Sequence, residues 1–157
     1  MKKVFTDTTI LIVEDNPDHI KLIEAVISRG LRGAHIRVAL LCEGARSYLR
    51  GEWPHYEDDG PNNSLPDLIV LDLWLPDGNG FELLRWIAER EWLKNIPVIV
   101  FTASTDAEHA LLAKELGVRR YLQKPAAFDK LVAAIKEELQ AADERNASGS
   151  MSGSAVR

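Results

Sequence analysis

Cysteine is nearly missing from this sequence, since Cys42 is the only one among 157 residues. A single cysteine excludes an internal disulfide framework, so a reducing, cytoplasmic setting is expected. Long hydrophobic runs are also missing: the longest is a few residues, whereas crossing a bilayer takes about 20. The first residues, 1–7, lack the apolar core of a signal peptide. We therefore expect neither a membrane-spanning segment nor a membrane partner.

Basic charge is in deficit as well. Lys and Arg number 19 against 24 Asp and Glu, which gives a net charge of −5. Nucleic acids and anionic membranes attract basic surfaces, so nucleic acid is not expected as a partner. Hydrophobic residues make up 46% and charged residues 27%, the ordinary balance of a globular protein. The length predicts one domain that is large enough to bury a real core.

Short apolar runs indicate the strands of a parallel sheet, because strands buried on both faces are apolar without alternation. The clearest runs are residues 10–13, 68–71 and 98–101, and residues 36–41 and 118–122 are weaker candidates. Helical patterns lie between them, and the cleanest apolar stripe is formed by Phe128, Leu131, Val132, Ile135 and Leu139. Strand and helix alternate five times. The predicted fold is α/β, a doubly wound five-stranded parallel sheet with helices on both faces.

Two stretches show neither pattern. Residues 53–65 are polar and rich in turn-forming residues, which predicts a long surface loop. After about residue 142 the chain becomes rich in Ser and Gly, a composition typical of flexible segments. We therefore expect a folded domain over residues 1–142 and a flexible tail over residues 143–157.

Polar side chains follow the predicted strands where each strand ends: Glu14, Asp15, Asp72, Thr102 and Lys124. In open parallel sheets, ligands bind beyond the carboxyl ends of the strands, so these side chains are expected to converge. Two carboxylates about 4 Å apart repel by roughly 4 kcal/mol at an effective dielectric constant of 20, which calls for a neutralising cation. An all-oxygen donor set suits Mg²⁺, which shares its remaining coordination with water and phosphate. The set predicts a site for a phosphoryl group and its metal ion.

The same residues lie in four motifs: residues 10–16 (ILIVEDN), 71–80 (LDLWLPDGNG), 101–103 (FTA) and 121–125 (YLQKP). In this order and spacing they resemble the receiver domain of two-component response regulators, and the resemblance covers about residues 9–139. It implies a flavodoxin-like receiver fold with strand order 2-1-3-4-5. It also implies a phosphoprotein of phosphorelay signalling, not an enzyme beyond its own phosphorylation and dephosphorylation.

The resemblance assigns the nucleophile and the metal ligands. Asp72 matches the phosphoacceptor, which takes the phosphoryl group from a phosphohistidine of a sensor histidine kinase. Glu14 and Asp15 match the acidic pair, with Asp15 a direct Mg²⁺ ligand and Glu14 acting largely through water. The backbone carbonyl of Trp74 matches the third protein ligand of the metal.

Three further residues match parts that respond to the phosphoryl group. Thr102 matches the hydroxyl residue that hydrogen-bonds the phosphoryl oxygens, and Lys124 matches the lysine that pairs with them. Tyr121 matches the aromatic switch, whose ring turns inward as Thr102 moves. Elementary chemistry agrees, because a carboxylate is a competent nucleophile and phosphoryl transfer needs mainly positioning and charge neutralisation.

The output and partners are expected from the chain's extent and from the resemblance. The sequence ends soon after the fifth predicted helix, so a stand-alone receiver that signals through protein contacts is expected. The long segment 53–65 is similar to that of receivers that partner bacterial phytochrome-type kinases; a chemotaxis-type target and a phosphorelay histidine protein are the alternatives. Receivers often dimerise through the fourth helix, fifth strand and fifth helix, which here carry a mixed-charge set: Lys114, Glu115, Arg119, Arg120, Lys136, Glu137 and Glu138.

Other functions fit the residues less well. A phosphatase of the haloacid-dehalogenase type would need a second Asp at position 74, which is Trp. A flavin- or nucleotide-binding module would need a phosphate cradle where residues 14–17 place acidic side chains. A receiver-like scaffold that never takes phosphate remains the main alternative. The four histidines, His19, His35, His55 and His109, show no metal-ligand spacing, and no role is expected of them.

Overall fold

The central sheet of the computed structural model, which describes residues 4–52 and 65–156, is wholly parallel. Its strands are β1 (Thr9–Val13), β2 (His35–Ala39), β3 (Leu68–Leu71), β6 (Val98–Thr102) and β7 (Arg120–Gln123). They lie in the order β2-β1-β3-β6-β7, which is the predicted order 2-1-3-4-5 when these five strands are counted in sequence. The surface loop predicted for residues 53–65 lies, except for its last residue, outside the described residues.

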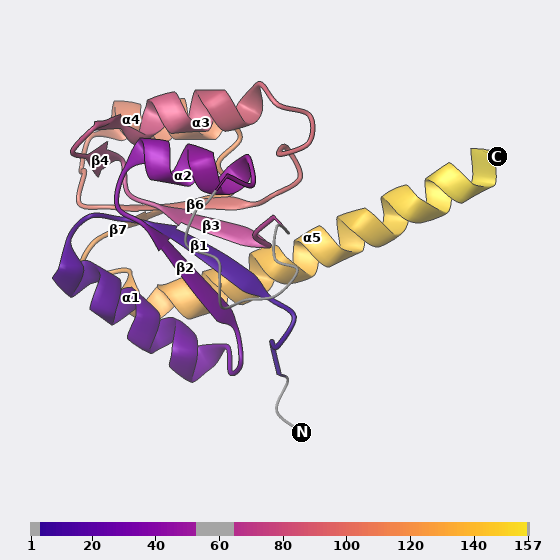
Figure 1. Ribbon diagram of the computed structural model, residues 1–157, viewed down its shortest axis with the longest axis horizontal. Coiled ribbons are helices and arrows are strands. Elements are labelled where there is room, and N and C mark those ends of the chain that lie inside the picture. The colour runs from indigo at the N-terminus through magenta and orange to yellow at the C-terminus, as the bar shows by residue number, and fades with distance from the viewer. Residues whose placement is uncertain (1–3, 53–64, 157) are drawn as a thin grey trace.

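Helices cover both faces of the sheet, as predicted (Figure 1). One face carries α1 (Pro17–Gly30) and α5 (Phe128–Val156), and the other carries α2 (Cys42–Leu49), α3 (Gly80–Ala88) and α4 (Ala107–Glu115). Two apolar clusters form the core, one on each side of the sheet. Every residue of β3 and β6 is buried, because each strand has neighbours on both sides and helices on both faces. This burial explains their uninterrupted apolar sequences.

A small antiparallel ribbon follows the end of β3. It consists of β4 (Trp74–Leu75) and β5 (Gly78–Asn79), a pairing that the sequence did not predict. Gly80 then starts α3 against the backbone of Asp72: a Cβ at this position would lie 2.9 Å from the Asp72 carbonyl oxygen. Only glycine permits this approach, which fixes the start of α3 beside the end of β3.

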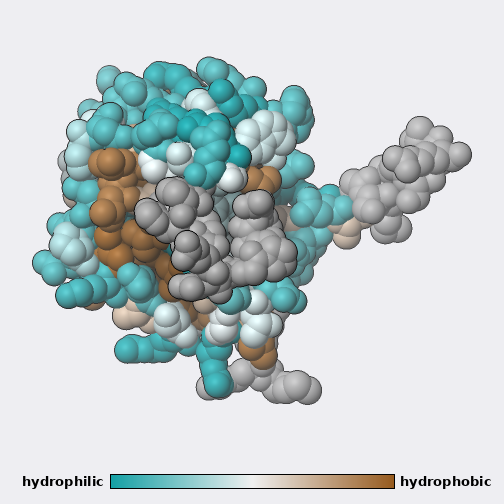
Figure 2. All heavy atoms as spheres, in the orientation of Figure 1, coloured by the Kyte–Doolittle hydropathy of each residue, from teal (hydrophilic) through white to brown (hydrophobic). Residues whose placement is uncertain are grey.

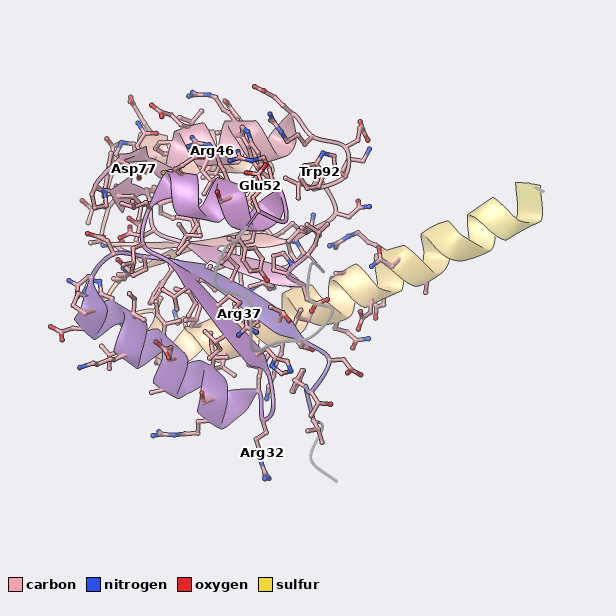
Figure 3. The ribbon with its side chains drawn as sticks, viewed as in Figure 1. Arg32, Arg37, Arg46, Glu52, Asp77 and Trp92 are labelled. Atoms are coloured by element: carbon pink, nitrogen blue, oxygen red, sulfur yellow. The ribbon has the colours of Figure 1, made fainter. Side chains whose placement is uncertain are left out.

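The turn of this ribbon also anchors a helix on the same face. The carboxylate of Asp77 accepts hydrogen bonds from the backbone N–H groups of Cys42 and Glu43, at 2.8 and 3.0 Å, and so caps α2 from a distance in sequence (Figure 3). Partial burial acts to raise the pKa of Asp77, but these N–H donors outweigh it and hold the pKa below its ordinary value. Leu41, the residue before α2, makes no capping hydrogen bond with its side chain.

Two further helices that start at the carboxyl edge of the sheet, α1 and α4, carry local caps. The side chain of Asn16 accepts hydrogen bonds from the backbone N–H groups of Asp18 and His19, and Asp106 accepts one from Glu108. Asp106 is the residue before α4 and caps that helix. Both caps place the first turns of α1 and α4 beside the carboxyl ends of β1 and β6.

Helix α5 extends beyond the folded domain predicted for residues 1–142. It continues through Val156, so most of the segment 143–157, for which a flexible tail was predicted, is helical and projects away from the domain (Figure 1). Extending an existing helix adds one hydrogen bond per residue without a new nucleation step, and the Gln140 amide donates to Glu144 one turn on. No helix in the described part of the chain is long and apolar enough to span a bilayer.

Strand β2 forms one edge of the sheet. Hydrophobic side chains gather between α1 and α2 on the face shown in Figure 2. Large exposed apolar residues in this part of the chain are Leu22 on α1 and Leu40 and Leu41 after β2. The strand itself is half-buried over most of its length.

Candidate functional site

The carboxyl edge of the sheet brings the predicted acidic residues together. Glu14 and Asp15 follow β1 and Asp72 follows β3, and one ligand oxygen from each lies within 4.8 Å of the others. Thr102 is the last residue of β6, and Lys124 follows β7. The Lys124 Nζ atom is 3.5 Å from Asp72 Oδ2. The five residues therefore meet as their positions after the strands predicted.

Glu14 and Lys124 form a buried ion pair inside this cluster. The Lys124 ammonium contacts Glu14 Oε1, and the two side chains are only 4% and 2% exposed. The other carboxylate oxygen of Glu14 accepts the backbone N–H groups of Asp15 and Asn16, at 3.0 and 3.1 Å. Buried charges are stable only when they are paired and hydrogen-bonded, and both conditions are met here.

The surroundings of Asp72 disfavour the ionised form of its carboxyl group. Its carboxyl group is 12% exposed, and burial raises its pKa above the ordinary value, with the neighbouring Glu14 charge acting in the same direction. Lys124 opposes the increase, as do hydrogen bonds from the Trp74 N–H and the Thr102 hydroxyl. The Trp74 N–H lies 3.4 Å from Asp72 Oδ1. Lys124 therefore offsets only part of the cost of a negative charge on Asp72, and a further positive charge would stabilise the ionised carboxylate.

The donor set fits a divalent cation. The oxygens of Glu14, Asp15 and Asp72 are hard ligands of the type that Mg²⁺ prefers, and Asp15 is exposed where the other two are not. One lysine cannot neutralise three carboxylates, so a divalent cation bound here would relieve the repulsion that remains. The metal ligation predicted for the Trp74 backbone carbonyl stays a prediction, since the contact of the Trp74 backbone with Asp72 is made by its N–H.

An aromatic rim stands beside the acidic cluster. The exposed Trp74 ring meets His109 of α4 edge-on, with ring centroids 5.3 Å apart, and Phe81 lies 5.4 Å from the same imidazole. His109 Nδ1 is 2.7 Å from the Ser104 hydroxyl, and the Ser104 N–H donates to Thr102 Oγ1. Contacts thus run from Thr102 to the start of α4 and on to Trp74.

Tyr121 lies within β7, whereas Lys124 follows the end of that strand. It pairs with Val100 in the sheet register and packs against the core on the α2–α4 side. Its hydroxyl is buried, and within the described residues it has no hydrogen-bond partner. A buried hydroxyl without a partner is destabilised, which is a reason for this ring to change position.

Two site residues were missed by sequence reasoning, His19 and His109. His19 Nδ1 is 3.0 Å from Lys124 Nζ and 3.5 Å from Glu14 Oε1. Each histidine is the third residue of a helix that starts beside this edge of the sheet. That position was the available signal: a side chain in the first turn after a site-bearing strand lies near the site. Both histidines were set aside because they lack metal-ligand spacing. That criterion applies to residues that bind a metal directly, and not to residues that contact the other side chains of the site.

Comparisons with known proteins agree with this geometry. The sequence profile of the response regulator receiver domain matches residues 10–136. The chain is 35% identical over 141 residues to the transcriptional regulatory protein GltR of Pseudomonas aeruginosa, covering 85% of this chain and 50% of GltR. It therefore spans about half the length of that relative.

Solved structures give the same result. The phosphorylated cyanobacterial phytochrome response regulator RcpA is 32% identical, with a TM-score of 0.69 over 83% of this chain and 89% of RcpA. The Mn²⁺-bound response regulator Rcp1 is 31% identical, with a TM-score of 0.71 over 82% of this chain and 91% of Rcp1. The chain belongs to the response regulator receiver domain family, a family of two-component signalling domains.

Proposed function

We propose that Asp72 accepts a phosphoryl group from a phosphohistidine of a sensor histidine kinase. An oxygen of the Asp72 carboxylate attacks phosphorus, the P–N bond breaks, and its electron pair leaves with the imidazole, so that an acyl phosphate forms. The observation that carries this proposal is the convergence of Asp72, Lys124 and two further carboxylates at one edge of the sheet. Phosphoryl transfer needs positioning and charge neutralisation more than covalent chemistry from other residues.

In this proposal the surrounding residues have distinct tasks. Asp15, Asp72 and, largely through water, Glu14 hold Mg²⁺ together with the Trp74 carbonyl. The bound cation supplies charge neutralisation for the phosphoryl oxygens. Lys124 supplies a second positive charge 3.5 Å from the nucleophile's carboxylate. The Mn²⁺-bound form of Rcp1 supports the choice of a divalent cation.

A small phosphodonor tests the proposal directly. Incubated with acetyl phosphate and Mg²⁺, the protein is expected to gain about 80 Da, the mass of one phosphoryl group, in its intact mass spectrum. The gain should disappear when a chelator removes the divalent cation. A folded protein that gains no mass with Mg²⁺ present would favour the alternative, a receiver-like scaffold that works without phosphate.

We further propose that Thr102 and Tyr121 pass the change to the surface. In the unphosphorylated protein the Thr102 hydroxyl donates to Asp72, and a phosphoryl group offers it new acceptor oxygens. The unpaired Tyr121 hydroxyl then has room to turn, because the ring borders a cavity of about 520 Å³ between α4 and β7. A hydroxyl shift of this kind biases a two-state surface and so alters protein contacts.

A phytochrome-type kinase is the sensor kinase that we propose as partner. Support comes from RcpA, which is described as a cyanobacterial phytochrome response regulator and matches most of this chain. Phosphotransfer from purified sensor kinases, compared at equal concentration, tests this choice. Faster phosphotransfer from a kinase of another class would contradict this choice and make that class the proposed partner. A cytoplasmic location accords with this partner and with the single free cysteine.

Dimerisation through α4, β7 and α5 is proposed on apolar contact, because four of the seven charged residues named for this face already form ion pairs within the chain. Arg119 and Arg120 both bind Glu138, and Arg120 also binds Glu137. The exposed Leu111 borders the cavity between α4 and β7 and offers a contact surface. We expect light scattering at micromolar concentration to show a shift from monomer to dimer when beryllofluoride and Mg²⁺ are added. A monomer under both conditions contradicts this surface as a dimer interface.

A further inference from the structure

His19 lies beside the proposed phosphoryl site, where it contacts Lys124. It is the third residue of α1 and its side chain is 34% exposed. Its Nδ1 atom is 3.0 Å from Lys124 Nζ, which is a hydrogen-bond distance, and 3.5 Å from Glu14 Oε1. The backbone N–H of His19 is held by the Asn16 cap, so the helix start fixes where the imidazole begins.

The chemistry of the two groups decides which one donates. A lysine ammonium has three N–H donors and no acceptor, so His19 Nδ1 must accept. An imidazole that accepts at Nδ1 is neutral and carries its proton on Nε2. A proton on Nδ1 would instead bring two donors together at 3.0 Å. The same hydrogen bond occupies the ring nitrogen that faces the acidic cluster, so His19 does not serve there as a metal ligand.

The ammonium of Lys124 has three hydrogens and three acceptors near it. Glu14 Oε1 and His19 Nδ1 lie within hydrogen-bond distance of Nζ, and Asp72 Oδ2 lies 3.5 Å from the same atom. Two fixed acceptors stop the ammonium from rotating about its Cε–Nζ bond. We propose that His19 is a positioning residue of the phosphoryl site: it orients Lys124 so that the third N–H points at Asp72 and at a phosphoryl group bound there. This inference rests on the proposed phosphoacceptor function.

The test compares three substitutions that keep or remove the acceptor. In His19→Asn the side-chain oxygen takes the place of Nδ1, whereas in His19→Gln it takes the place of Nε2, and His19→Ala has no acceptor. His35→Ala is a matched control, because His35 starts β2 at the opposite end of the sheet. For each protein, calorimetry measures the affinity for Mg²⁺ and then for beryllofluoride, a phosphoryl mimic, at saturating Mg²⁺.

We expect His19→Ala and His19→Gln to bind beryllofluoride about tenfold more weakly, since each loses one hydrogen bond to a charged group. Mg²⁺ affinity should stay within about twofold, because the lysine does not ligate the metal. His19→Asn should recover most of the affinity for beryllofluoride. A merely structural role for His19 would lower both affinities together and would not distinguish Asn from Gln.

Two results overturn the inference alone: wild-type affinity for beryllofluoride in His19→Ala, or equal losses in His19→Asn and His19→Gln. A wild-type protein that binds no beryllofluoride overturns the proposed function and the inference together. Nitrogen NMR gives an independent readout that does not depend on phosphoryl chemistry. The expected spectrum shows the His19 proton on Nε2, and a proton on Nδ1 at neutral pH would contradict the hydrogen bond to Lys124.

Discussion

Replacing Asp72 with Asn is expected to abolish the gain of one phosphoryl mass, lowering the yield from acetyl phosphate by more than about a hundredfold. The amide has nearly the shape of the carboxylate but no nucleophilic oxygen anion. Asp18→Asn is the matched control, because Asp18 lies exposed in the first turn of α1, close in sequence to the acidic pair. The control should be phosphorylated like the wild type, as measured by intact mass at fixed times.

Continued phosphorylation of Asp72→Asn would show that another carboxylate accepts the group. Asp15 would then be the first candidate, because it is the exposed member of the cluster. Fragmentation of the modified protein would locate the phosphoryl group. If both the wild type and Asp72→Asn are phosphorylated, Asp72 is not the acceptor. The protein would still be one that accepts a phosphoryl group on a carboxylate.

The same variant has a second expected effect, on stability, whose sign follows from the pKa of Asp72. Burial raises that pKa in the folded protein, so the folded state binds a proton more tightly than the unfolded chain. Stability associated with Asp72 is fully present below its unfolded pKa of about 3.9 and is lost as the pH rises through the raised folded value. Without divalent cations, Asp72→Asn should thus melt higher than the wild type at neutral pH, and the advantage should vanish near about pH 4.

Most of the fold was predictable because buried parallel strands leave a direct record in the sequence. Residues 68–71 and 98–101 are apolar throughout, and the structure makes them β3 and β6 at the centre of the sheet. Once the strands are located, the carboxyl-edge rule places Asp72 and Thr102 next to each other without any knowledge of the loops. The edge strands were harder: β2 begins at His35 and β7 at Arg120, where alternation with polar residues blurs the boundary.

The pairings inside the site could not be predicted from the same rule. Glu14 and Lys124 are 110 residues apart, and their direct contact depends on how β1 and β7 are spaced across the sheet. Sequence reasoning expected three acids around a metal and a separate lysine for the phosphoryl group. In the structure Lys124 also forms an ion pair with Glu14. The in-chain pairs of Arg119 and Arg120 with Glu138 were likewise invisible, because helix rotation decides which charges meet.

Lys124→Met is expected to destabilise the metal-free protein by about 3 kcal/mol, the lower end of the range for breaking a buried ion pair. Methionine keeps the length of the side chain but leaves Glu14 buried without its cation. The backbone N–H groups of Asp15 and Asn16 still bind Glu14, which is why the lower end applies. For a domain of this size the melting temperature should fall by roughly 10 °C in a thermal unfolding scan.

The decisive comparison is the double variant Glu14→Gln/Lys124→Met. If the loss arises from an uncompensated buried charge, neutralising Glu14 restores part of it, and the two changes together cost less than their sum. Lys114→Met is the matched control, since Lys114 is exposed on α4 and its replacement should change stability by less than about 0.5 kcal/mol. Additive losses would show instead that Lys124 stabilises the fold through packing. In that case its charge would be free for the phosphoryl group, and Glu14 would be held by its two backbone donors.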